Sequence, residues 1–240
     1  MYSRREWLTG VGAGGVLAAL PGCTDWTRQL GVGERHLVSH GPHPLSIVQW
    51  HRMQPDPQSV LRQRALCARH LPAAWLRGLD ARMRETLARS GGVGLAAPQV
   101  GLCRRVILVQ LQRPGKPVLT CVDPVLRCAE DSVDGYEACL SVRAVGSLVP
   151  RSRAVEVAYT DLEGRQRRLS STGWEARIFQ HEVDHLNGVL YLDRRVGPVL
   201  PIEEVRRRRR RRRAETPAPA PAPAPIWVAA REGGEGPWVL

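Results

Sequence analysis

The stretch Gln180–Gly188 limits what this chain can fold into more than any other, because it reads QHEVDHLNG. It places His181 and His185 four residues apart, with Glu182 directly after the first histidine. On a helix, residues i and i+4 lie on one face, so the two imidazoles can bind one metal ion together. Glu182 then lies close enough to exchange protons with a water molecule on that ion.

The residues before this stretch favour a helix. Trp174 and Ile178 continue the spacing of the two histidines toward the N-terminus, which predicts that the histidines lie on the buried face. Asn187-Gly188 is a stop signal. The alternative is a helix with two core histidines, but a chain seldom buries two imidazoles and a carboxylate without a partner. Two histidines leave a metal ion under-coordinated, so a third ligand must come from elsewhere in the chain.

Most of the positive charge is confined to Arg206–Arg213, an unbroken run of eight arginines. Removing these eight charges from the formal net charge of +12 leaves +4 for the rest of the chain, which is therefore only mildly basic. Like charges in such a run repel, so we expect it not to pack. No apolar run approaches the ~20 residues needed to span a membrane.

The N-terminal segment, residues 1–43, is expected to be an extension outside the folded domain. Ser3–Leu8 resembles a twin-arginine export signal, and Leu20–Cys23 resembles a lipoprotein cleavage box with Cys23 as the lipidated residue. The alternative is a basic N-terminus on a cytoplasmic protein. Residues 24–43 are expected to be a linker.

We expect one catalytic domain over residues 44–200, followed by a low-complexity and disordered tail over 201–240. The tail combines the arginine run with an Ala-Pro alternation, typical of an extended spacer. Within the domain, apolar periodicity predicts a helix over 76–90 before Gly91-Gly92. Alternation and turn residues predict strands at 46–50, 105–111, 118–122, 154–160 and 167–171. A helix, several short strands and a second helix indicate an α+β fold.

Two further stretches carry groups suited to a reaction centre. Gly92–Gln99 reads GVGLAAPQ, where the glycines allow a close approach of backbone to a ligand and Gln99 offers an amide donor. Glu137–Ser141 reads EACLS and holds Cys139, which without other information would be interpreted as a small buried hydrophobe.

Together with Gln180–Gly188, these two stretches resemble, in order and spacing, the three signature motifs of the peptide deformylases. The resemblance covers about residues 44–195. It implies a fold of small mixed or antiparallel β-sheets packed around a central metal-binding helix. It also implies an enzyme that hydrolyses N-formylmethionyl peptides and releases formate.

The resemblance implies one divalent metal ion held by Cys139, His181 and His185, with water in the fourth position. Ferrous iron is the family's usual metal, and zinc, nickel and cobalt are the alternatives; these ligands suit several of them. In the implied mechanism the metal-bound water attacks the formyl carbon with Glu182 as general base and then acid. Gln99 and the backbone N–H of Leu140 stabilise the oxyanion.

The resemblance further implies that the peptide binds in an extended form against backbone at Gly92, Val93 and Gly94, with its methionine side chain in an apolar pocket. Deformylases act on nascent chains, so Arg206–Arg213 is a candidate contact with the ribosome or rRNA. A monomer is favoured, and the reaction favours a cytoplasmic location in a bacterium.

Three positions depart from the family pattern. Ala138 stands where glycine is usual, Arg143-Ala144 replaces a common Pro-Gly, and Asp123 replaces an asparagine. If residue 138 needs a positive φ, its Cβ costs about 1 kcal/mol or more. None of these changes removes a catalytic group, although a catalytically inactive relative is one alternative.

Two other functions compete with this interpretation. A zinc peptidase of the His-Glu-x-x-His type needs a third His or Glu downstream, but residues 186–240 contain no histidine, and Glu203 and Glu204 stand next to the arginine run. A protein that chiefly binds nucleic acid would use Arg206–Arg213.

Overall fold

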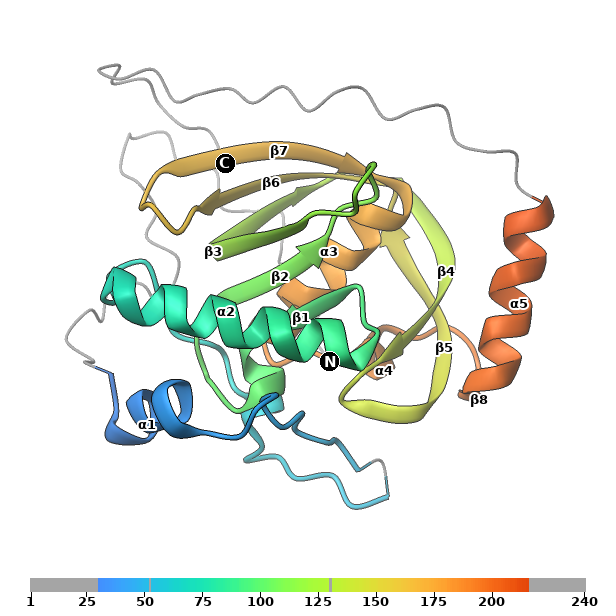
Figure 1. The fold of residues 1–240 in the computed structure, drawn as a ribbon. Coiled ribbons are helices and arrows are strands. Elements are labelled where there is room, and N and C mark those ends of the chain that lie inside the picture. Colours follow the sequence, from blue (N-terminus) through green and yellow to red (C-terminus); the bar gives the residue numbers. More distant parts are fainter. Residues whose placement is uncertain (1–29, 52, 130, 216–240) are drawn as a thin grey trace, which may run out of the picture.

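The computed structural model describes residues 30–215 of the 240-residue chain, apart from positions 52 and 130 (Figure 1). The proposed export signal, the lipidation site at Cys23 and the Ala-Pro spacer lie outside the described residues. The helices are α1 (Val32–His40), α2 (Ala73–Ser90), α3 (Gly173–Leu186), α4 (Tyr191–Arg194) and α5 (Ile202–Glu215), with 3₁₀ turns η1 (Val60–Arg62) and η2 (Ala97–Val100). The strands are β1 (Gly94–Ala96), β2 (Val106–Gln110), β3 (Val118–Cys128), β4 (Ser132–Cys139), β5 (Val142–Ser152), β6 (Ala154–Thr160), β7 (Gln166–Thr172) and β8 (Leu200–Pro201).

The strands form two antiparallel sheets, one in the order β1-β2-β3-β6-β7 and one in the order β4-β5-β8. Helix α3 contacts strands of both sheets and lies between them (Figure 1). The α+β architecture around a central helix is therefore confirmed.

The two long helices α2 and α3 cover opposite faces of the β1–β3 part of the larger sheet (Figure 1). Successive side chains of a strand point to opposite faces, and the two cores divide accordingly. Leu95 and Leu108 pack with Leu79 and Met83 of α2, whereas Ala96 packs with residues of α3. The segment that carries the two histidines is therefore held against a sheet whose far face is also covered.

Several predicted elements are present with nearly the predicted bounds. The helix expected over 76–90 is α2, and it ends at Gly91, whose φ of 67° is the left-handed conformation that favours glycine. The strand expected to stop at Val122 continues to Cys128, because a bulge between Val122 and Val125 absorbs the irregular backbone. The segment 46–50, expected to be an edge strand, lies outside both sheets.

Residues 30–43 are not the linker that composition suggests. Helix α1 packs against α2, and the guanidinium of Arg82 donates hydrogen bonds to the carbonyls of Leu37 and Val38 at 2.7 and 2.8 Å. Glu34 accepts two further bonds from Arg104 at 2.6 and 2.7 Å. These contacts satisfy the last carbonyls of α1 and hold it on the domain.

The arginine run does pack, contrary to the expectation of a disordered segment from residue 201. It forms most of α5, where Val205 is completely buried. Arg209 and Arg212 donate to backbone carbonyls of β4 at 2.9 and 2.8 Å. Glu203 forms an ion pair with Arg206, so part of the like charge is neutralised within the helix. Among the described helices, none is long and apolar enough to cross a membrane.

Candidate metal centre

The sulfur of Cys139 and the rings of His181 and His185 meet in one cluster, although the cysteine lies more than forty residues away in the chain. One ligand atom from each lies within 4.8 Å of the others. The i, i+4 spacing places both histidines on the inner face of α3, with ring centroids 5.0 Å apart. The Sγ of Cys139 lies 3.2 Å from the Nε2 of His185.

Cys139 is the last residue of β4, directly before the tight turn that leads into β5. The backbone N–H of Ser141 and the amide Nε2 of Gln99 both point at its sulfur, at 3.4 Å each. These two donors fix the position of the sulfur beside the histidine rings.

A buried carboxylate orients the first histidine. The Nδ1 of His181 lies 2.9 Å from Glu137, which leaves Nε2 to face the cluster. Arg151 donates two hydrogen bonds to the same carboxylate, both at 2.9 Å. Burial acts to raise the pKa of Glu137, but the hydrogen bonds from His181 and Arg151 outweigh it and hold that pKa well below its usual value. Glu137 is therefore a fixed negative charge behind the histidine.

The charges around Glu137 form a network that joins α3 to β4 and β5. Arg177, one turn before the first histidine, donates to Glu137 and to the carbonyl of Val149, both at 2.8 Å. Arg151 also contacts Asp184 of α3 at 2.5 Å, and Asp184 accepts a bond of 2.6 Å from Arg194. Because these carboxylates are buried, each needs its cationic partners in place.

Glu182 is buried beside the cluster without a partner for its Oε2 atom. Burial is the main cause that raises the pKa of this carboxyl to about 7. The side chain lies tightly against β1: a Cβ at Gly94 would stand 2.8 Å from its carboxyl carbon. An unpartnered buried oxygen is costly, so it indicates a group that interacts with something bound at the site.

The two expected oxyanion donors lie next to the cysteine. Gln99, on η2, is held by its own Oε1, which accepts a bond of 2.8 Å from the N–H of Ala96. This contact aims the amide Nε2 at the cluster. Leu140 follows the cysteine in the turn, and its side chain lies over Gly92.

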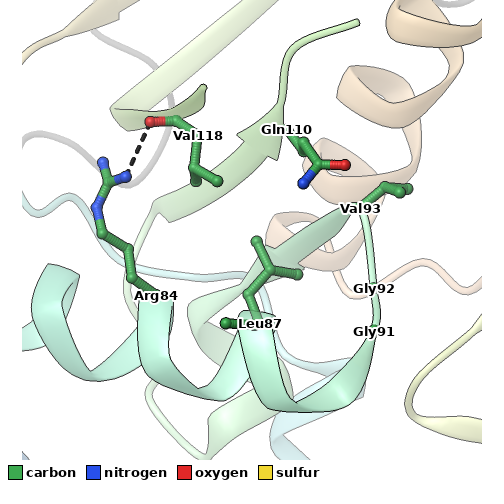
Figure 2. A pocket seen from close by; sticks show the side chains of 8 residues that line it. Arg84, Leu87, Gly91, Gly92, Val93, Gln110 and Val118 are labelled. Atoms are coloured by element: carbon green, nitrogen blue, oxygen red, sulfur yellow. Dashed lines mark hydrogen bonds between the residues drawn. The ribbon is translucent and has the colours of Figure 1, made fainter. Parts of the chain in front are cut away.

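The three residues expected to bind the peptide backbone lie at one edge of the larger sheet. Strand β1 is an edge strand, so one side of its backbone has no strand partner among the described residues. Gly92 and Val93 lead into β1 and, with Gly91, line a half-open cavity of about 280 Å³ (Figure 2). Figure 2 shows Leu87 of α2 and the amide of Gln110 on either side of this cavity.

The residues present fit a divalent metal ion. One thiolate and two imidazoles are three protein ligands, which leaves a position open for water or substrate, as catalytic sites require. Glu182, next to His181 in the chain, also keeps a buried oxygen without a hydrogen-bond partner, which suits a site that holds a further polar group. The third member of the cluster is Cys139, whereas Glu203 and Glu204, the downstream carboxylates considered for a zinc peptidase, pair with arginines of α5.

The positive φ considered for Ala138 occurs at Ala144 instead. Ala138 does not have a positive φ, so the cost considered for its Cβ does not arise, and Gly146 faces it across the ladder. Ala144 and Asp123, in contrast, have φ of 63° and 49°. Asp123 gains two hydrogen bonds there, from the N–H groups of residues 68 and 69.

Sequence reasoning named Glu137 only as part of a motif and missed Arg151, Arg177 and Asp184. The signal available was the position of two acidic residues inside the motifs, beside Cys139 and between the histidines. Nothing in the sequence pairs them with arginines from other elements.

Comparisons with known proteins identify one family. The family model for polypeptide deformylases matches residues 50–199. The peptide deformylase of Desulforudis audaxviator is 40% identical over 151 residues, covering 62% of this chain and 92% of that protein. Peptide deformylase 2 of a Nostoc strain is 38% identical over 143 residues, covering 56% of this chain and 80% of that protein. The crystal structure of a Synechococcus elongatus peptide deformylase with actinonin is similar, with a TM-score of 0.58, 38% identity and coverage of 64% and 82%. The crystal structure of the Thermotoga maritima peptide deformylase is also similar, with a TM-score of 0.57 and 32% identity, and the match covers 65% of this chain and 100% of that chain.

Proposed function

This chain belongs to the peptide deformylase family and is a peptide deformylase, and from this premise we propose how its own residues remove the formyl group from N-formylmethionyl peptides. Cys139, His181 and His185 would hold one divalent ion, with Fe²⁺ preferred and Zn²⁺, Ni²⁺ and Co²⁺ as alternatives. When bound, such an ion lowers the pKa of a water molecule toward ~7 and polarises a carbonyl.

Glu182 acts as the proton carrier in this mechanism. It takes a proton from the water that attacks the formyl carbon, and it returns the proton to the departing amine, which releases formate. Its burial and its unpartnered Oε2 support this role. Gln99 and the N–H of Leu140 would donate to the formyl oxygen as charge develops on it. Losing one such donor typically costs about 10²–10³ in rate.

The substrate would bind as an additional strand along the free edge at Gly92, Val93 and Gly94. An unpaired strand edge offers main-chain donors and acceptors to an extended peptide, which gives affinity without reading its sequence. Gly94 allows the carboxylate of Glu182 to lie close to this edge, since a side chain at Gly94 would collide with it. Broad tolerance beyond the first residue is therefore expected.

The observation that carries this proposal is the cluster of one thiol and two imidazoles next to a buried, unpartnered glutamate. The test is formate release from formyl-Met-Ala-Ser by protein loaded separately with Fe²⁺ under nitrogen, Zn²⁺, Ni²⁺ or Co²⁺. Glu182→Gln should retain the metal and lose activity. Cleavage of an internal peptide bond, or no formate with any of the four metals, would contradict the proposal.

A second proposal concerns contact with the ribosome through α5. Arg206, Arg207 and Arg210 are exposed. Replacing these three by glutamine while keeping Arg209 should weaken co-sedimentation with ribosomes. It should also reduce the magnitude of the slope of log K against log salt by about 2 to 3, at roughly 0.7–0.9 for each phosphate contact. Unchanged binding and an unchanged slope would contradict it.

We further propose a cytoplasmic location, where formylated chains emerge, over export and lipid attachment at Cys23. Fusing residues 1–45 to a reporter and fractionating the cells tests this. A membrane-bound or exported reporter would favour the signal.

A further inference from the structure

Helix α5 presents one row of residues to the catalytic domain. Val205, Arg209 and Arg212 follow the i, i+4, i+7 spacing of a single helix face. Val205 lies against Gly146 of β5, and Arg212 donates to the carbonyl of Asp134 on β4. The helix is therefore held on the domain by specific side chains, and these side chains contact different strands.

Arg209 contacts both elements that supply metal ligands. Its Nε donates to the carbonyl of Tyr136 on β4 at 2.9 Å, three residues before Cys139. Its guanidinium carbon lies 5.1 Å from the ring centroid of Trp174, in the first turn of α3. A cation over an indole ring is attracted to it, so the ring acts as the second attachment point.

The contact point on β4 is next to the carboxylate that orients the first histidine. Burial lowers the pKa of Arg209, and the nearby Glu137 opposes that shift, so the two charges lie within electrostatic range. Glu137 follows Tyr136 directly and bonds to His181. A displacement of β4 at Tyr136 would therefore move the support of His181 together with the cysteine.

We propose that Arg209 is a positioning residue for the metal centre, because its guanidinium ties the strand that carries Cys139 to the helix that carries both histidines. This inference rests on the proposed metal site. It assigns to one arginine of the run a function different from that of its outward-facing neighbours.

The test is the rate at which zinc-loaded, full-length protein loses its metal to an excess of a chromophoric chelator. Arg209→Ala removes one hydrogen bond and one cation–π contact, and we expect about tenfold faster loss, equivalent to ~1.4 kcal/mol. Arg212→Ala is the matched control, since it removes contacts between α5 and β4, namely the hydrogen bond to Asp134 and the guanidinium group over the Tyr136 ring. It should change the rate less than about twofold. Arg209→Lys keeps the charge and should give an intermediate rate.

Equal rates for the Arg209→Ala and Arg212→Ala proteins would overturn the inference. If Arg209→Ala does not fold, the rates of zinc loss from Trp174→Leu and Arg209→Lys are measured instead. Wild-type rates for both variants would overturn the inference. Wild-type protein that binds no zinc would refute the proposed metal site itself, which is a separate result. A kcat that falls more than KM rises in Arg209→Ala would support positioning.

Discussion

Replacing Gly94 by alanine tests whether the tight contact between β1 and Glu182 sets the reaction rate. The added Cβ would stand 2.8 Å from the carboxyl carbon and 2.9 Å from Cγ of Glu182, and closer still to Oε1. Carbon atoms pack best at roughly 3.5–4.0 Å, so the carboxylate must move by about 1 Å. A displacement of about 1 Å in a reacting group can cost about 10²-fold in rate, equivalent to about 2.7 kcal/mol.

The assay is formate release from formyl-Met-Ala-Ser, with kcat and KM determined separately and metal content measured on the same samples. We expect Gly94→Ala to lower kcat by about 100-fold while its metal content stays at the wild-type level. Combining the change with Glu182→Ala gives the control, because a displaced carboxylate cannot matter once it is absent. A further large loss in that double variant, or an unchanged kcat in the single one, would refute the reasoning.

Three further predictions concern the support of the site and the fold. Glu137→Gln should lower zinc affinity by about 10- to 100-fold in a chelator competition, since His181 loses its carboxylate partner; unchanged affinity would contradict this. Ala144→Gly should raise the free energy of unfolding in urea by about 0.5–1 kcal/mol, because φ is 63° there, and a decrease would exclude strain. Burial acts to raise the pKa of Glu34, but its hydrogen bonds with Arg104 and the backbone lower it overall. The carboxylate therefore stabilises the fold above its unfolded pKa, and this is lost as the pH falls through the lower folded pKa. The stability difference from Glu34→Gln should be present at pH 7 and shrink below about pH 4, whereas a difference constant with pH would contradict it.

Local periodicity accounts for how much of the fold could be predicted. Helices α2 and α3 and strands β2 and β6 each carry a strong apolar pattern, whereas β7, with Leu169 as its one apolar residue, was predicted from the hairpin turn before it. The β4–β5 hairpin was not predicted, because its turn, Leu140-Ser141, has no glycine, proline or asparagine. Its register is instead shifted near Ala138, where the strand meets the metal cluster.

The site shows a similar division between motif residues and their supports. The three ligands and Glu182 lie in short motifs, so a resemblance could identify them. Arg151 lies in strand β5 and Arg177 in helix α3, and any buried residue would fit the sequence pattern at either position. Their role arises only because β4 brings Glu137 between them, which is a long-range contact that spacing cannot reveal.

The arginine run is the case in which sequence composition is least informative. Eight identical residues have no periodicity, so neither a helix nor a buried face can be inferred from them. A helix nevertheless gives them different environments, because Arg208, Arg209 and Arg212 reach strand β4 whereas Arg206 and Arg207 pair with glutamates of the helix itself. Carbonyl oxygens of β4 and the ring of Trp174 can accept guanidinium groups, and this offsets the repulsion along the helix. A segment of one charged residue type can therefore be both a structural contact and an exposed basic surface, and only substitutions made one face at a time separate the two.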